Sequence, residues 1–91
     1  MLRRIRKQSA PDPFVILSVQ ERLARVACKI RDLEQGDVIW AKGHHLKAAE
    51  IAYDDLLAEA CGLAGIPIPQ ASRPVRRLIM EADLHGCGWT W

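Results

Sequence analysis

Residues 44–63 read HHLKAAEIAYDDLLAEACGL, and the spacing of the apolar residues in this stretch decides the fold. They recur at alternating steps of three and four residues: Leu46, Ala49, Tyr53, Leu56, Ala60 and Leu63. Such steps place the side chains in one row along a single face of an α-helix. The stretch therefore predicts an amphipathic helix with this row turned toward a core.

A second row with the same spacing lies upstream. Its members are Ile16, Val19, Leu23, Val26, Ile30 and Leu33. Two helices with apolar rows of equal length and a short connection favour an antiparallel hairpin. Because the helix at 44–63 is also apolar beside its row, at Ile51 and Leu57 among others, we expect it to be the central helix.

Two signals compete for the start of the first helix. Asp12 can cap a helix that has Pro13 at its first position. Ser18 and Glu21 instead match the spacing of a capping box. The unbroken apolar row from Ile16 onward favours the earlier start.

Gly36 and Gly43 bracket the connection between the two helices. We expect the first helix to stop at Gly36, with residues 38–40 forming a short helical turn over one end of the bundle and the second helix starting near residue 44. A rival interpretation carries the first helix through to Lys42, at a cost of about 1 kcal/mol for a glycine inside a helix.

The run GIPIPQ at 65–70 cannot continue a helix, because its two prolines lack the required N–H groups. Ser72 is the expected cap of a third helix that ends at Gly86. Its apolar face contains Val75, Leu78 and Ala82, with Ile79 beside them. The sequence predicts an all-α fold, a three-helix bundle built on an antiparallel αα-hairpin, either closed alone or completed by dimerisation.

Length and composition set the class of protein. Ninety-one residues, of which 49% are apolar and 26% charged, are typical of one globular domain. We divide the chain into a flexible basic arm, residues 1–12, and a single helical domain, residues 13–91. Three cysteines without a CxxC spacing indicate reduced thiols and a soluble, cytoplasmic protein, and no apolar run approaches the ~20 residues that span a bilayer.

Histidines and acidic residues near the ends of helices suggest one kind of site, a metal centre. The weak candidates are His44, His45, Glu81, His85 and Cys87. Zinc accepts these side chains, but they come from distant segments and match no zinc module. We expect neither a bound metal nor a cofactor.

Basic residues suggest a nucleic-acid site, at positions Arg3, Arg4, Arg6, Lys7, Arg73, Arg76 and Arg77. Arginines on an arm and at a helix N-terminus can bind phosphates. Against this, the formal net charge is only +2, and the helix at 44–63 has acidic residues that offer ion pairs to Arg76 and Arg77.

Apolar surface suggests a protein interface, with candidates Trp40, Ile51, Trp89 and Trp91. Tryptophan is enriched at interfaces. The competing interpretation folds the C-terminal tail back to close the open end of the bundle.

Three short segments carry a resemblance: HHLKA at 44–48, AYDD at 52–55 and GWTW at 88–91. They make the chain similar to a set of small helical actinobacterial proteins of uncharacterised function, and the resemblance implies no activity.

No nucleophile lies beside a base, and adjacent Asp54 and Asp55 diverge on a helix, so we expect no enzyme. The function we predict is a non-catalytic helical interaction module that self-associates or binds a protein partner. The alternative is a nucleic-acid-binding accessory protein, and the third hypothesis is a metal-binding helical protein.

Overall fold

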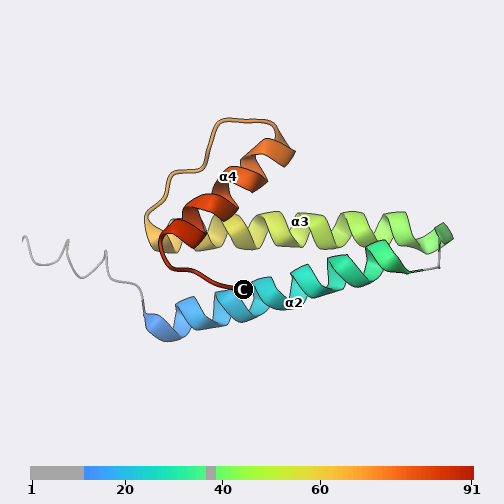
Figure 1. The fold of residues 1–91 in the computed structure, drawn as a ribbon, viewed down its shortest axis with the longest axis horizontal. Helices are drawn as coiled ribbons and strands as arrows, with labels where there is room; N and C mark the ends of the chain where they lie inside the picture. Colours follow the sequence, from blue (N-terminus) through green and yellow to red (C-terminus); the bar gives the residue numbers. More distant parts are fainter. Residues whose placement is uncertain (1–11, 37–38) are drawn as a thin grey trace, which may run out of the picture.

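The computed structural model describes residues 12–36 and 39–91, with the backbone alone for residues 39–42. This part of the chain forms α2 (Pro13–Gln35), α3 (Ile39–Ala64) and α4 (Arg73–Gly86), and it contains no strand (Figure 1). The all-α prediction is confirmed. Residues 1–11 lie outside the described part, so the predicted basic arm is not placed.

The start of α2 is the earlier of the two predicted positions. Asp12 is the cap, and its Oδ1 accepts a hydrogen bond from the backbone N–H of Phe14 at 2.9 Å. Pro13 occupies the first turn, where a missing N–H costs nothing. The capping-box alternative at Ser18 is wrong, because Ser18 lies inside the helix.

The connection between α2 and α3 is at Gly36. α2 ends at Gln35, and the Gly36 N–H bonds the carbonyl oxygen of Leu33 at 3.3 Å. α3 already begins at Ile39, so Gly43 is an interior helical residue and the predicted start near residue 44 is about five residues too late. The rival reading, a first helix through Lys42, is also wrong.

The two apolar rows meet as predicted. α2 and α3 form an antiparallel hairpin, and every member of both rows is buried or half-buried. The buried core contains Val19, Leu23, Tyr53, Leu57, Ala60, Cys61, Met80, Leu84 and Trp89. α3 lies between the other two helices and packs against both, which confirms its central place (Figure 1). Within the described residues, the backbone of α4 does not approach α2.

The C-terminal tail closes the gap between α4 and α2. Gly88 adopts φ +94°, and the N–H of Trp89 bonds the carbonyl of Leu84 while that of Gly88 bonds the carbonyl of His85. This is a Schellman turn, in which the left-handed glycine reverses the chain. Trp89 enters the core, and the Thr90 N–H donates to the Gln20 side chain on α2 at 2.9 Å. The interpretation in which the C-terminal tail folds back onto the bundle is therefore confirmed for Trp89.

α4 is rotated relative to the prediction. Met80 and Leu84 are its buried residues, whereas Val75, Leu78 and Ile79 are exposed. The expected core face of the third helix is therefore wrong. The reason lies in the charged groups between α3 and α4, described below.

None of the helices in the described part of the chain combines the length and the apolar character needed to cross a membrane.

Candidate functional site

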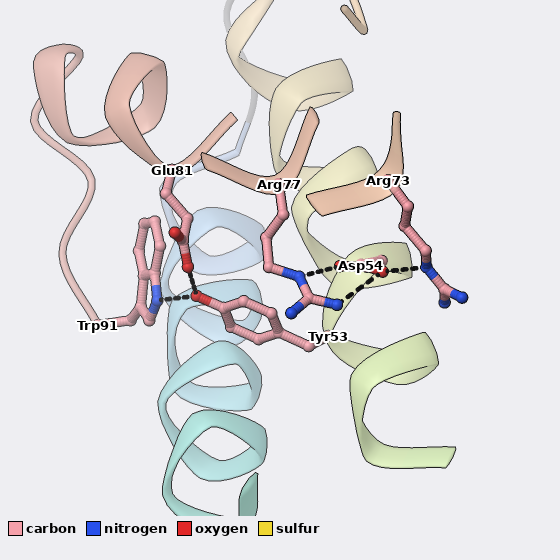
Figure 2. A network of polar contacts seen from close by, with 6 residues as sticks. All are labelled: Tyr53, Asp54, Arg73, Arg77, Glu81 and Trp91. Carbon is pink, nitrogen blue, oxygen red and sulfur yellow. Dashed lines mark hydrogen bonds and ion pairs between the residues drawn. The ribbon is translucent and has the colours of Figure 1, made fainter. Parts of the chain in front are cut away.

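The best-defined polar cluster joins α3 to α4 (Figure 2). Asp54 is the one charged residue that is buried among the described side chains, at 9% exposure. Arg77 donates to both of its oxygens, from Nε to Oδ1 at 2.6 Å and from Nη2 to Oδ2 at 3.0 Å. Arg73 Nε donates to Oδ2 at 2.7 Å. Bidentate pairing of this kind is strong and fixes the orientation of both groups.

The charges of this cluster stabilise one another. Burial by itself raises the pKa of the Asp54 carboxyl, but hydrogen bonds from Arg77 and Arg73 and their positive charges outweigh it, so that pKa lies below its ordinary value. The hydrogen bond to Asp54 raises the pKa of the Arg77 guanidinium. The group is therefore ionised near neutral pH, and loss of one partner would leave buried charge uncompensated.

A second cluster shares Arg77 with the first. The Tyr53 hydroxyl donates to Oε2 of Glu81 on α4 and accepts a hydrogen bond from Trp91 Nε1 at 3.1 Å. The Arg77 guanidinium lies 5.9 Å from the centre of the Tyr53 ring, within cation–π range. Burial, followed by the hydrogen bond to Glu81, raises the pKa of the Tyr53 phenol well above its ordinary value.

These contacts determine which way α4 faces. Arg73, Arg77 and Glu81 are spaced by four residues and lie on one side of the helix, beside Met80 and Leu84. Pairing the two arginines with Asp54 turns this side toward α3. The sequence carried a usable signal, the four-residue spacing opposite an acidic helix, but the apolar residues of α4 outweighed it in the prediction.

Two open hollows flank the cluster. One, of about 270 Å³, is lined by Glu50, Arg73, Pro74 and Arg77. The other, of about 220 Å³, is lined by Ala27, Ile30, Arg31, Tyr53, Arg77 and Glu81. Among the described residues their linings contain no serine, threonine or cysteine, and Arg73, Arg77 and Glu81 already have hydrogen-bond partners within the cluster. The observable effect of the cluster is to orient α4.

The opposite side of α4 is an apolar surface open to solvent. We call it the outer face of α4, formed by Val75, Leu78, Ile79 and Ala82. Leu78 is 66% exposed, and the other three are also classed as exposed. Their spacing of three, one and three residues makes a continuous stripe, the pattern by which a helix normally faces a core. Here that stripe faces outward.

The metal candidates do not converge. His44 and His45 lie in the first turns of α3, Glu81 accepts the Tyr53 hydrogen bond, and the His85 ring lies 4.3 Å from the Trp91 ring. In residues 12–36 and 39–91, no three side chains of His, Cys, Asp or Glu gather as a metal site would require. The Cys87 thiol is exposed, whereas the Cys61 thiol on α3 is buried, and burial raises its pKa.

The nucleic-acid candidates are separated by their partners. Arg73 and Arg77 are paired with Asp54, which confirms the predicted ion pair for Arg77 with the acidic helix. The ion pair expected for Arg76 is wrong: this half-buried side chain forms no ion pair with another described residue. The candidates at Arg3, Arg4, Arg6 and Lys7 lie outside the described residues.

The interface candidates have different fates. Trp89 is 6% exposed and belongs to the core, and Trp91 is half-buried against Tyr53. Ile51 is exposed on α3. The side chain of Trp40 lies outside the described part. The outer face of α4, which the prediction placed in the core, thus exposes more apolar surface than Trp89 and Trp91 do.

In comparisons with known proteins, no family model, no curated protein and no solved structure matches the chain.

Proposed function

We propose that this protein is a small helical interaction module that binds another protein chain through the outer face of α4. The observation that carries the proposal is the outward direction of an apolar stripe on a strongly amphipathic helix. Exposed single apolar residues are normal, whereas a continuous stripe on one helix marks a surface that binds a partner.

The polar cluster supports the same conclusion. Were α4 free to rotate, burying Leu78 and Ile79 in place of Arg73 and Arg77 would be favoured by the hydrophobic effect, at roughly 1.5–3 kcal/mol for each large aliphatic side chain. Asp54 instead holds the arginines inward in a paired, bidentate geometry. The fold therefore presents the stripe through specific contacts, as a groove-binding helix is presented to its target.

Photo-crosslinking tests the proposal. A photoreactive amino acid replaces Leu78 on the outer face of α4 and, as a matched control, the exposed Ala24 on α2. After irradiation of cells that express each variant, we expect a crosslink to one specific protein from position 78 and no crosslink from position 24. The adduct partner, purified, should then bind the native chain at least about tenfold more tightly than the Leu78→Glu variant. The absence of an adduct at position 78 would refute the proposal.

A further inference from the structure

The outer face of α4 is flanked by one positive and one negative residue that form no ion pair within the described part of the chain. Arg76 and Asp83 are seven residues apart, close to two full turns, so they lie along the same flank of the stripe. They stand on the order of 10 Å apart along the axis, too far to pair with each other. Neither forms an ion pair with another described residue.

This arrangement is self-complementary. When two identical helices pack antiparallel about a two-fold axis, each flank meets the same flank of the other copy with its direction reversed. Arg76 of one copy then lies opposite Asp83 of the other, and the reciprocal pair forms at the other end. A parallel pairing would instead place this flank against the opposite flank of the other copy, so that Arg76 and Asp83 would not meet.

The apolar residues fit the same symmetry. Leu78 and Ile79 lie at the centre of the stripe, where a two-fold axis brings both copies' large side chains together. Ala82 and Gly86, which are exposed and small, allow the two backbones to approach near the ends. The apolar stripe and its flanking charges are therefore complementary to the same face of a second copy of α4.

Resting on the proposed function, we infer that the partner of the outer face of α4 is α4 of a second copy, packed antiparallel, with two reciprocal Arg76–Asp83 ion pairs. A 14-residue helix is about 21 Å long and covers less than the roughly 800 Å² per partner of a standard interface. The dimer should therefore be reversible, with a dissociation constant in the range of about 1 μM to 1 mM.

Sedimentation velocity on the native chain, in a concentration series that spans this range, measures the association. We expect a shift from monomer to dimer with rising concentration. Leu78→Glu should weaken it at least about tenfold, because a charge is placed at the buried centre. The matched control is Phe14→Glu, which alters an apolar side chain that is 80% exposed on α2, and it should leave the dissociation constant unchanged.

A charge exchange tests the antiparallel geometry. Arg76→Glu and Asp83→Lys should each weaken dimerisation by roughly two- to tenfold, since each creates two like-charge contacts at the rim. The double variant restores opposite charges and should return the dissociation constant close to that of the native chain. Circular dichroism confirms that each variant stays helical.

Two results would overturn the inference. A monomer at every concentration excludes the second copy as the partner, and failure of the double exchange to restore association excludes the antiparallel pairing. Either result is separable from failure of the proposed function. A crosslink from position 78 to a different protein would keep the interaction surface while replacing its occupant, whereas no crosslink at all would remove both.

Discussion

At the scale of single residues, Asp54 couples its charge to folding. Its pKa in the folded protein lies below the ordinary value of 3.8, so the unfolded chain binds its proton more readily. The stabilisation is therefore fully present above the unfolded pKa and is lost as pH falls through the folded pKa. The cluster formed with Arg73 and Arg77 should stabilise the protein at neutral pH and weaken in acid.

We predict that Asp54→Asn lowers the free energy of unfolding at pH 7 by about 3 kcal/mol, because Arg77 is left half-buried without its carboxylate. The deficit should shrink below about pH 4, because there the unfolded form of the unaltered chain begins to bind a proton at Asp54 and the stabilisation from the folded carboxylate declines. Urea unfolding at several pH values measures it. Asp55→Asn is the control, because the carboxylate of Asp55 is next in sequence, is exposed and forms no ion pair with a described residue. Equal losses in the two variants would contradict the buried-pair explanation.

Tyr53 offers a direct optical test, because it is the single tyrosine of the chain. Its pKa is raised by burial and by the hydrogen bond to Glu81, so the neutral phenol is favoured in the folded state. That contribution is complete below the unfolded pKa of about 10 and is lost as pH rises toward the folded value. Ultraviolet absorbance of the phenolate should appear at higher pH in native protein than in urea.

The Glu81→Gln variant extends this titration. It removes the negative charge and the charged acceptor that oppose ionisation of Tyr53, so the native phenolate should appear at lower pH than in the unaltered protein. Identical native and denatured titrations of the unaltered protein would show that Tyr53 is exposed, contrary to the described packing.

At the scale of helices, the glycines distinguish the turn from the helix interior. Gly43 lies within α3, and a Cβ added there meets nothing within 4 Å. Gly43→Ala should therefore stabilise the protein by about 0.5–1 kcal/mol, measured by thermal or urea unfolding. Gly65 has φ +74° at the end of α3, so Gly65→Ala should destabilise it by about 1 kcal/mol. Destabilisation by Gly43→Ala would place a turn at residue 43 instead.

The two rows of apolar residues were predictable because each fills one face of a long helix. Steps of three and four from Ile16 to Leu33, and from Leu46 to Leu63, give each helix a face that must be buried. The start of α3 was missed because Gly43 resembles a stop signal, although packing of a long helix overrides a penalty of about 1 kcal/mol.

The orientation of α4 was not predictable from periodicity. Its apolar stripe and its row of Arg73, Arg77 and Glu81 both have helical spacing, and either could face α3. The choice depends on Asp54 being placed opposite the arginines, which is a tertiary relation between segments 19 and 23 residues apart. The sequence therefore identified the residues of the outer face of α4 as one face of a helix, but the prediction turned that face toward the core instead of toward solvent.

At the scale of the whole molecule, the C-terminal tail holds the third helix to the first. Within the described residues the backbone of α4 approaches α3 and not α2, although side chains of both helices belong to the same core, so the segment after Gly88 adds to the connection between α4 and α2. Trp89 fills the core between the helices, Thr90 bonds Gln20 of α2, and Trp91 bonds Tyr53. Three residues thus close a side of the core that helix packing leaves open.

Removal of the Trp89 ring from the core should therefore lower the stability of the protein. Trp89→Ala leaves a cavity beside Leu84 and should lower the free energy of unfolding by about 3–5 kcal/mol. In a domain of this size the melting temperature should fall by more than about 12 °C. The half-buried Trp91 is the matched control, because Trp91→Ala removes one hydrogen bond and should cost about 1–2 kcal/mol. Calorimetry with light scattering separates the alternatives: an unchanged melting temperature with an altered molecular mass would make Trp89 an interface residue.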